Sequence, residues 1–413
     1  MSSYTAGGGG VEPYRVMVVD DSAVIRGLFI RVLEADPEIR VVASAANGRI
    51  ALNQLKRQPV EVVVLDIEMP EMDGLTALPE LVRAQPGLKV IMASTLTRKN
   101  AAVSMEALAK GAVDYIPKPS ATSEVYSNEG FSRELLAKVK AHADRGRRDG
   151  TAPALGSGGG AAAPAAPSAA ASPTTAYRPR TEPAAPAARP VAAPATAADL
   201  PQRLGLQRKP VVLRPFPPAF RAKALAVGSS TGGPQALFTL FGALGPALQR
   251  IPVFITQHMP ATFTTILAEH LARASGLPCV EAEDGMPVKA GRIHVARGDW
   301  HMVPTEAAGG AVIRINQDAP ENFCRPAVDP MLRGLAKIYG RNLLTVILTG
   351  MGSDGQRGGE HVVQAGGVVM AQDEASSVVW GMPGAAAQAG LCSAVLPLDR
   401  MAGEVRRLVD GGP

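Results

Sequence analysis

Residues 16–33, VMVVDDSAVIRGLFIRVL, contain the pattern that decides the fold of the first part of the chain. The apolar run Val16–Val19 is typical of a buried parallel strand, and it ends in Asp20 and Asp21. Apolar residues then recur at helical spacing over the next dozen positions. A strand, an acidic turn and a helix in this order predict one unit of a parallel, doubly wound α/β sheet.

The same pattern recurs at three later apolar runs, 62–65, 90–93 and 115–116. Polar residues follow the ends of all four predicted strands: Asp20, Asp21, Asp66, Ser94 and Lys118. Because the carboxyl ends of parallel strands meet at one edge of a sheet, we expect these side chains to cluster there. Three carboxylates beside one lysine suit a hard divalent cation such as Mg²⁺. The alternative is that these are separate, solvated loop residues. That would account well for a single aspartate after a strand, but poorly for five polar residues at successive strand ends.

These motifs resemble the receiver domain of response regulators across residues 14–132. The matching segments are VVDDS (18–22), VLDIEMPEMDG (64–74), MAS (92–94) and KP (118–119). The resemblance implies a flavodoxin-like fold in which Asp66 accepts a phosphoryl group from a histidine kinase. It also implies a cis peptide between Lys118 and Pro119.

The resemblance further implies roles for the residues around Asp66. Asp21, Asp66 and the carbonyl of Glu68 would bind the Mg²⁺ needed for phosphorylation, with Asp20 in support. The Asp66 carboxylate would be the nucleophile, while the cation and Lys118 neutralise charge on the transferring phosphoryl group. The hydroxyl of Ser94 would hydrogen-bond to the new phosphoryl oxygens.

A second set of strand-end motifs begins with the apolar run 224–227, which continues into GSSTGG at 228–233. A serine among glycines after a strand can belong to a phosphate-binding turn or to a turn that projects a nucleophilic hydroxyl. The segment matches neither GxGxxG nor GxxxxGK[ST], but it matches GxSxG with Ser230 at the centre. A plain glycine turn remains an alternative at this point.

A serine nucleophile needs a base and a residue that orients the base. The apolar run 253–256 ends just before His258, and the run 343–348 ends just before Asp354. With Ser230, these residues are predicted to meet at one sheet edge. A lone histidine is more often structural than catalytic, and five others are present: His142, His270, His294, His301 and His361.

Residues 222–410 resemble the catalytic domain of the chemotaxis protein-glutamate methylesterases, the CheB family. The matching segments are VGSSTGGPQAL (227–237), QHMP (257–260), GRIHVARGDWHM (291–302), RPAVD (325–329), LTGMGSDG (348–355) and DEASSVVWGMPGAA (373–386). The resemblance implies an α/β fold in two parts. A receiver domain is followed by a doubly wound, mainly parallel α/β/α methylesterase domain.

The second resemblance also implies a reaction and its residues. Ser230 would be the nucleophile, His258 the general base and acid, and Asp354 the residue that orients His258. The backbone amide of Met351 would help to form the oxyanion hole. The reaction would be hydrolysis of glutamate methyl esters on chemoreceptors, with deamidation of receptor glutamines, activated by phosphorylation, for sensory adaptation in chemotaxis. The esterase would need no cofactor.

Composition divides the chain into three parts. Residues 151–200 hold 20 alanines and 9 prolines with one aromatic residue, a composition that cannot form a packed core. We place a receiver domain at 14–135, a disordered linker at 146–221 and the methylesterase domain at 222–410. The net charge of +5 comes from the basic linker, because each flanking part carries one net negative charge. The basic pI of 9.2 therefore does not predict a nucleic-acid partner.

Three widely spaced cysteines without a CxxC motif fit a reducing compartment, and we expect a cytoplasmic protein. The first ten residues do not resemble a signal peptide, and no apolar run reaches 18 residues. We therefore expect no direct insertion into a membrane. The expected partners are methyl-accepting chemoreceptors as substrates and a chemotaxis histidine kinase as phosphodonor.

Two other hypotheses compete with the methylesterase. A response regulator with a DNA-binding output domain would need a basic module after the linker, which the near-neutral region 222–413 does not provide. A non-catalytic adaptor would have lost one of the three triad residues, and all are present. The linker looks long for the family, so we also expect weaker inhibition of the esterase by the unphosphorylated receiver.

Overall fold

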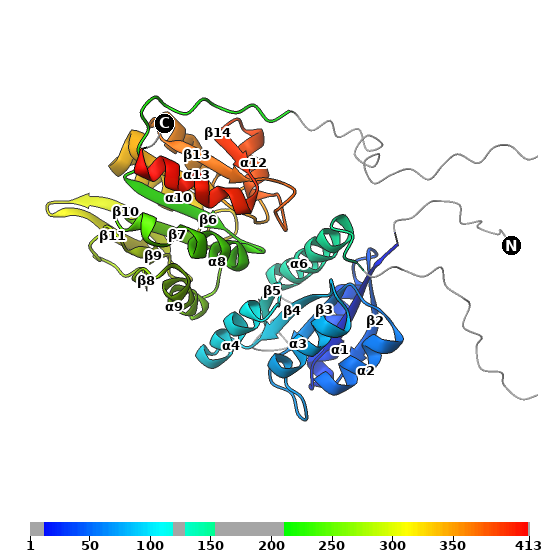
Figure 1. Ribbon diagram of the computed structural model, residues 1–413. Coiled ribbons are helices and arrows are strands. Elements are labelled where there is room, and N and C mark those ends of the chain that lie inside the picture. The colour runs from blue at the N-terminus through cyan, green and yellow to red at the C-terminus, as the bar shows by residue number, and fades with distance from the viewer. Residues whose placement is uncertain (1–11, 119–128, 153–209, 412–413) are drawn as a thin grey trace, which may run out of the picture. The chain divides into compact units, whose positions relative to one another are not determined.

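The structure is a computed structural model that describes residues 12–118, 129–152 and 210–411. These residues form two α/β domains, which precede and follow residues 153–209 in the sequence (Figure 1). The predicted cis peptide at Lys118–Pro119 and the central part of the predicted linker lie outside the described residues.

The N-terminal domain has a five-stranded sheet with the order β2-β1-β3-β4-β5, and every neighbouring pair is parallel. The strands are β1 (Tyr14–Val19), β2 (Ile39–Ala45), β3 (Val62–Asp66), β4 (Lys89–Ser94) and β5 (Asp114–Pro117). The helices are α1 (Ala23–Glu34), α2 (Gly48–Arg57), α3 (Gly74–Ala84), α4 (Arg98–Ala109) and α6 (Glu129–Arg148). This order confirms the predicted flavodoxin-like α/β fold.

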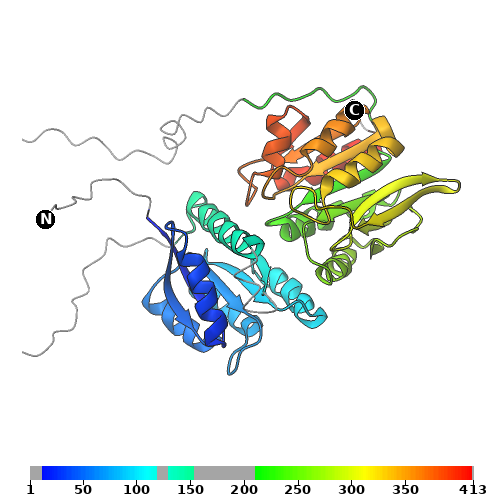
Figure 2. The same cartoon turned by 180° about the vertical axis from the view of Figure 1, so that it is seen from behind.

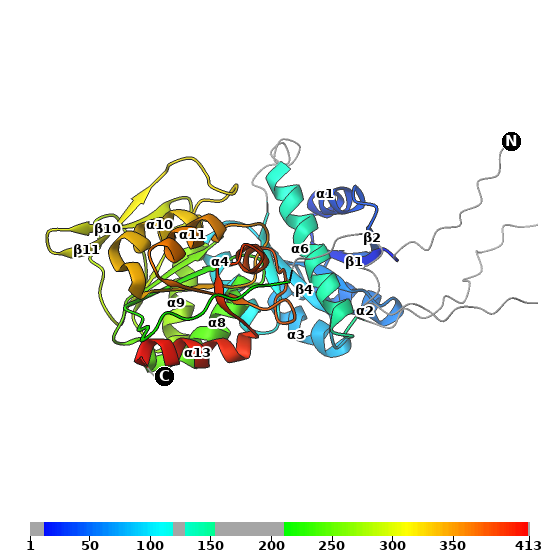
Figure 3. The same ribbon diagram turned by 90° about the horizontal axis from the view of Figure 1, so that it is seen from above.

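Alternating side chains of the N-terminal sheet fill two cores. Val16 and Val18 of β1 pack with Phe29 of α1 and with α6 on one face, while Met17 and Val19 face α2 and α3. Figure 3 shows α1 on one side of this sheet and α2 and α3 on the other. Continuous apolar strands are the expected signature of a sheet that is covered on both faces.

The C-terminal domain has a seven-stranded parallel sheet with the order β14-β13-β12-β6-β7-β9-β8. Its strands are β6 (Ala224–Ser229), β7 (Val253–Gln257), β8 (Cys279–Glu281), β9 (Ile293–Val295), β12 (Leu343–Ile347), β13 (Val368–Gln372) and β14 (Cys392–Leu396). An antiparallel hairpin, β10 (His301–Ala307) and β11 (Gly310–Asn316), forms a separate two-stranded ribbon (Figure 2). The parallel sheet confirms the predicted doubly wound architecture.

Helices cover both faces of the C-terminal sheet. They are α8 (Gly233–Leu244), α9 (Phe263–Ser275), α10 (Val328–Tyr339), α11 (Gln356–Gln364), α12 (Met382–Gln388) and α13 (Leu398–Asp410), with 3₁₀ turns η2 (Gly245–Leu248) and η3 (Gly340–Asn342). Leu225 and Val227 of β6 face the core under α8, α9 and α13, and Ala224 and Ala226 face the core under α10, α11 and α12. Small residues on the second face let α10 approach the sheet closely.

Strand order places a topological switch point in each domain. In the C-terminal sheet, β6 lies between β7 and β12, and the connections leaving β6 and β12 run to opposite sides. In the N-terminal sheet the same point lies between β1 and β3. Open α/β sheets bind ligands at the carboxyl ends of the strands at this point. All of the predicted acidic and triad residues follow these strands or their neighbours.

The predicted linker boundaries are too wide at both ends. Helix α6 continues to Arg148, past the predicted domain end at residue 135, because Val139 and Ala143 still pack against the sheet. At the other end, the N–H of Arg214 donates to the carbonyl of Cys392 at 2.9 Å, and Phe216 packs against the C-terminal core. These contacts are long-range, so local composition alone did not reveal them.

Within the described part of the chain, no helix has the length and apolar character that crossing a membrane requires.

Candidate active site and phosphorylation site

Ser230 lies directly after β6, where the chain turns sharply into α8. Gly232 has φ of 73°, in the left-handed region that glycine adopts without strain, and α8 begins at the next residue. The Ser230 N–H donates to the carbonyl of Thr349 at 3.0 Å, which ties this turn to the segment after β12. The GxSxG pattern therefore forms a strand–turn–helix elbow with Ser230 at the strand end, as the motif requires.

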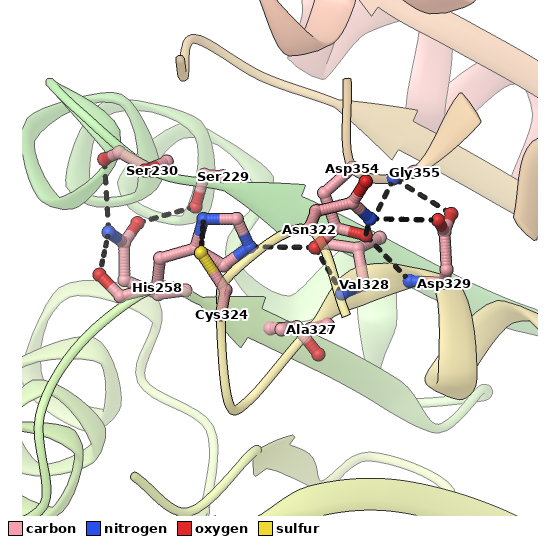
Figure 4. Close-up of polar contacts among 12 residues, drawn as sticks. Ser229, Ser230, His258, Asn322, Cys324, Ala327, Val328, Asp329, Asp354 and Gly355 are labelled. Atoms are coloured by element: carbon pink, nitrogen blue, oxygen red, sulfur yellow. Dashed lines mark hydrogen bonds and ion pairs between the residues drawn. The ribbon is translucent and has the colours of Figure 1, made fainter. Parts of the chain in front are cut away.

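Gln257, the last residue of β7, connects this elbow to the histidine segment. Its side chain accepts a hydrogen bond from the Ser229 hydroxyl at 2.7 Å and donates to the carbonyls of Ser230 and His258 at 3.0 and 3.1 Å. The His258 N–H in turn donates to the carbonyl of Ser229 at 3.1 Å. One buried amide thus fixes the spacing between the serine and histidine segments (Figure 4).

His258 and Asp354 form a direct pair. The Nε2 atom of His258 lies 2.7 Å from Oδ2 of Asp354, as Figure 4 shows. Burial lowers the pKa of His258, but the hydrogen bonds to Asp354 and to Cys324 outweigh that effect and raise it overall. The structure therefore brings together two of the three predicted triad residues in hydrogen-bond contact. Ser230 stands at the neighbouring strand end, and its hydroxyl makes no hydrogen bond with the residues that the structure describes.

Asp354 is held by the amino terminus of α10. Its carboxylate accepts hydrogen bonds from the backbone N–H groups of Val328 at 2.6 Å and Asp329 at 3.0 Å, in the first turn of that helix. Residue 327, the N-cap, is an alanine and offers no side-chain oxygen, so Asp354 acts as the cap from another segment. Burial raises the pKa of Asp354, but His258 and these N–H groups outweigh it and lower the pKa overall.

Asp329 makes the reciprocal contact. Its Oδ1 accepts from the N–H groups of Gly355 at 2.9 Å and Gly358 at 2.7 Å, at the start of α11. Asn322 joins the two acids, because its amide donates to Asp329 at 3.1 Å and to Asp354 at 3.0 Å. Burial and the charge of Asp354 raise the pKa of Asp329. Two buried carboxylates therefore cap each other's helices, and an asparagine bridges them.

The segment after β12 approaches Ser230 closely. A Cβ atom on Gly350 would lie 2.8 Å from the Cβ of Ser230, so only glycine permits this contact. Among the described residues, no acceptor bonds to the N–H of Met351, the next residue. A free backbone N–H beside a nucleophile is what an oxyanion hole requires.

Two of the other histidines have structural surroundings. His294 is buried in β9, stacks on Phe254 at 5.3 Å and hydrogen-bonds to the carbonyl of Val253, and burial lowers its pKa to about 4. His301 accepts from the N–H of Ala327 and contacts the carbonyl of Ala319. These contacts separate His258 from His294 and His301, which the sequence alone did not.

The N-terminal domain gathers its acidic residues as predicted. Ligand atoms of Asp20, Asp21 and Asp66 all lie within 4.8 Å of one another. The ammonium of Lys118 contacts Asp20 and Asp66, each at 2.6 Å. Burial raises the pKa of Asp66 to about 6, although Lys118 acts in the opposite direction. Hard oxygen donors at this spacing fit a divalent cation such as Mg²⁺.

The remaining predicted residues of this site border it. Ser94 is buried at the end of β4 and accepts a hydrogen bond from the Ser104 hydroxyl at 3.0 Å. Asp21 and Glu68 line one pocket of about 610 Å³, and the Glu68 side chain forms an ion pair with Lys99 at 3.2 Å. The Glu68 side chain is therefore engaged by Lys99 at the rim of this pocket.

Gly74 lets the loop after β3 fold against Asp66. A Cβ atom at residue 74 would lie 2.0 Å from the carbonyl oxygen of Asp66, and the Gly74 N–H donates to the carbonyl of Ile67 at 2.9 Å. The next helix, α3, is capped by Asp73, whose side chain accepts from the N–H of Thr76 at 2.7 Å. Residues 72–74 (MDG) thus shape the loop beside Asp66 and begin helix α3.

Comparison with known proteins supports both resemblances. A family model described as CheB methylesterase matches residues 225–405, and one described as response regulator receiver domain matches residues 16–128. The protein-glutamate methylesterase/protein-glutamine glutaminase of group 2 operon from Rhodospirillum centenum is 55% identical over 400 residues, which are 97% of this chain and 95% of the relative. The chain belongs to the CheB methylesterase family.

A second relative matches over a similar length, and a solved structure matches the methylesterase part. The protein-glutamate methylesterase/protein-glutamine glutaminase of Azospirillum brasilense is 50% identical over 98% of this chain and 95% of its own length. A crystal structure of the Thermotoga maritima CheB methylesterase catalytic domain is 38% identical and covers 46% of this chain and 99% of that one, with a TM-score of 0.44. The relatives from Rhodospirillum centenum and Azospirillum brasilense therefore match the receiver domain and the methylesterase domain together.

Four residues of the methylesterase domain were not singled out from the sequence: Gln257, Asn322, Cys324 and Asp329. Gln257 and Asp329 lie in the motifs QHMP and RPAVD, so their proximity to predicted residues was the available signal. The sequence around Asn322 and Cys324 offered no comparable signal, because they lie in a loop that follows no strand of the parallel sheet.

Proposed function

We propose that this protein hydrolyses glutamate methyl esters on chemoreceptors, and deamidates receptor glutamines, under control of phosphorylation at Asp66. The observation that carries the proposal is the His258–Asp354 pair beside the Ser230 elbow, at the switch point of the methylesterase sheet. Family membership supports the reaction class, because the relatives are named for these two activities.

The proposed reaction uses Ser230 as the nucleophile. Its hydroxyl oxygen bonds to the ester carbonyl carbon while its proton passes to His258. Because Nε2 of His258 faces Asp354, the accepting atom is Nδ1. The N–H of Met351 would stabilise the oxyanion that forms.

The tetrahedral intermediate then collapses. The carbon–oxygen bond to the methoxy group breaks, and His258 returns the proton to that oxygen, which releases methanol. Water, activated by the same imidazole, then attacks the acyl-enzyme and frees glutamate and Ser230. A glutamine side chain follows the same course with ammonia as the leaving group.

Asp354 supports these proton transfers through its position. Hydrogen bonds from the N–H groups of Val328, Asp329 and Gly355 keep it ionised and oriented toward Nε2. An ionised, fixed carboxylate stabilises the imidazolium that forms when Ser230 attacks.

In the receiver domain, we propose that Asp66 is the phosphoryl acceptor. Asp21, Asp66 and the Glu68 carbonyl would hold Mg²⁺, which when bound neutralises charge on the phosphoryl group. Lys118 already contacts Asp66 and Asp20, so it can follow the phosphoryl oxygens as the carboxylate is modified. The Ser94 hydroxyl, at the end of β4, would donate to one of these oxygens.

One assay tests both parts of the proposal. Methanol release is measured from a chemoreceptor cytoplasmic fragment that carries glutamate methyl esters, using wild type, Ser230→Ala and Asp66→Asn. We expect Ser230→Ala to release no methanol above background. Asp66→Asn should keep the basal rate but lose activation by a small phosphodonor with Mg²⁺, and EDTA should reproduce this loss in wild type. Equal methanol release by wild type and Ser230→Ala would refute the esterase assignment.

A further inference from the structure

The tight turn at residues 321–324 lies beside the proposed triad. The N–H of Cys324 donates to the carbonyl of Glu321 at 2.9 Å, and the N–H of Glu321 donates back at 3.1 Å. The two central residues, Asn322 and Phe323, have φ of 52° and 63°. Positive φ at both positions is the signature of a type I′ turn. Asparagine tolerates this conformation, but phenylalanine adopts it rarely and at an energetic cost.

This strained turn contacts both the acid and the base of the proposed triad. The side chain of Asn322 donates to Oδ1 of Asp354 at 3.0 Å. On the other side of the turn, the sulfur of Cys324 lies 3.3 Å from Nδ1 of His258 (Figure 4). The backbone conformation of this turn therefore positions Asn322 against Asp354 and Cys324 against His258.

The contact to Nδ1 conflicts with the proposed proton transfer. Because Nε2 of His258 bonds to Asp354, Nδ1 is the atom that must accept the proton of Ser230. A neutral imidazole offers one lone pair at this atom, and a thiol S–H and a serine O–H cannot both donate to it. In the described structure the sulfur holds this position, and the Ser230 hydroxyl has no hydrogen bond to the imidazole.

We propose that the Cys324 thiol acts as a brake on the esterase by competing with Ser230 for Nδ1 of His258. This inference rests on the proposed function, since it assumes that His258 is the base for Ser230. Cys324 is a positioning residue in this scheme: it contacts neither substrate nor the reacting carbon. Each attack requires the sulfur–imidazole contact to break first.

The size of the effect follows from the strength of one neutral hydrogen bond. Such a bond contributes modestly in water-accessible protein sites, which corresponds to a change of roughly 2- to 10-fold in rate. The first test compares kcat and KM of full-length wild type and Cys324→Ala on the methylated receptor fragment. We expect kcat to rise by about 2- to 10-fold, with KM unchanged, because substrate contacts are not altered. An unchanged or lower kcat would overturn the proposal.

Two control variants show whether a change in kcat comes from the lost hydrogen bond or from a general effect on folding. Cys324→Ser restores a hydrogen-bond donor in the same turn, and its kcat should return toward the wild-type value. Cys279→Ala removes a thiol from β8, two strands away from β7, and should leave kcat unchanged. A rise in kcat in Cys279→Ala equal to that in Cys324→Ala would show that the effect is not specific to the turn, and would refute the brake.

Alkylation gives a second, independent readout. Burial raises the pKa of the Cys279 and Cys392 thiols to about 12, so iodoacetamide should react selectively at Cys324. The new S–C bond forms as iodide leaves, and the added group blocks Nδ1. We expect iodoacetamide to inactivate wild type and Cys279→Ala but to spare Cys324→Ala. Equal inactivation of Cys324→Ala would contradict the position assigned to the thiol.

Ser230→Ala separates failure of this inference from failure of the proposed function. If Ser230→Ala is inactive and Cys324→Ala is no faster than wild type, the brake alone is wrong. If Ser230→Ala is as active as wild type and Cys324→Ala is inactive, the Cys324 thiol is itself the nucleophile. Both proposals are then overturned.

Discussion

At the scale of single residues, the partners of His258 determine the pH range in which the esterase can work. In the proposed mechanism the neutral imidazole accepts the proton of Ser230, so protonated His258 would be inactive. Asp354 and Cys324 are the titratable groups in contact with the ring, and the Asp354 carboxylate favours the imidazolium. The pKa of His258 therefore lies above the ordinary 6.5 despite burial. The rate should therefore be low at acidic pH and rise as pH increases through this raised pKa.

The prediction is tested by kcat/KM for methanol release between pH 5 and pH 9, corrected for base-catalysed ester hydrolysis. We expect the acidic limb of the wild-type profile to lie above pH 6.5. In Asp354→Asn the limb should move to lower pH because the carboxylate no longer stabilises the imidazolium, and activity should fall by on the order of 10⁴-fold. A wild-type limb at or below pH 6 would contradict the raised pKa.

Gly74 offers a second prediction at this scale. Gly74→Ala would place a Cβ 2.0 Å from the carbonyl oxygen of Asp66, so the loop must move and the phosphorylation site must distort. We expect strongly reduced phosphoryl incorporation from a small phosphodonor with Mg²⁺. The matched control is Gly27→Ala in α1, where nothing lies within 4 Å of the new methyl group. Normal phosphorylation of Gly74→Ala would show that this close approach is not needed.

At the scale of elements, helices α10 and α11 depend on carboxylates from each other's segments. Asp329→Ala would remove the acceptor for the N–H groups of Gly355 and Gly358. Unsatisfied buried donors typically cost about 1–3 kcal/mol, and relief of the repulsion between Asp329 and Asp354 should offset part of this loss. We therefore expect the methylesterase domain to lose about 1–2 kcal/mol of unfolding free energy.

Tryptophan fluorescence measures this loss selectively, because both tryptophans, Trp300 and Trp380, belong to the methylesterase domain. Urea unfolding of Asp329→Ala is compared with that of Asp284→Ala. Asp284→Ala removes the ion-pair partner of Arg314. Both side chains of that pair are more than half exposed, so its loss should cost under 1 kcal/mol. Equal midpoints for the two variants would show that the reciprocal capping contributes no more than a surface ion pair.

The same elements show what the sequence could and could not predict. Apolar runs that end in polar residues predicted the strands and placed Ser230, His258 and Asp354 at one edge. The parallel sheets and the domain order are confirmed. Asn322 and Asp329 were not assigned, because their partners are backbone N–H groups and carboxylates that only the packing of α10 against α11 brings near. The contact of Cys324 with His258 depends on an unusual turn conformation that no local pattern indicates.

Domain limits illustrate the same point. Residues 146–148 and 214–216 look like linker by composition, yet the first group is helical and the second contacts the C-terminal domain. Arginine suits the surface of a helix as well as an extended tether, so composition cannot separate the two. Long-range contacts decided the boundary.

At the scale of the whole molecule, the length of the tether should set how strongly the unphosphorylated receiver limits the esterase. Effective concentration of a tethered domain falls roughly as the −3/2 power of tether length. Deleting residues 160–199 would shorten the tether between Arg148 and Arg214 from 65 to 25 residues. The receiver's effective concentration should then rise about fourfold. We expect the basal methanol-release rate to fall by up to this factor, while the rate after phosphorylation stays the same.

The measurement compares full-length protein with the deletion variant, each with and without a small phosphodonor and Mg²⁺. Replacing residues 160–199 by a Gly/Ser segment of equal length is the matched control, since it changes composition but keeps the reach of the tether. A deletion that leaves the basal rate unchanged would show that tether length does not limit inhibition. In that case the strength of the contact between the domains would have to set the basal rate.

Because α10 and α11 cap each other, the first turns of the two helices should open together when this part of the site unfolds locally. Breaking the Asp354 contacts frees the first N–H groups of α10, and breaking the Asp329 contacts frees those of α11, while Asn322 links the two events. The amides of both helix starts should therefore exchange with deuterium at a common rate. A ligand that engages His258 would slow exchange in both helices at once, so its occupancy can be followed at the backbone amides of both helix starts.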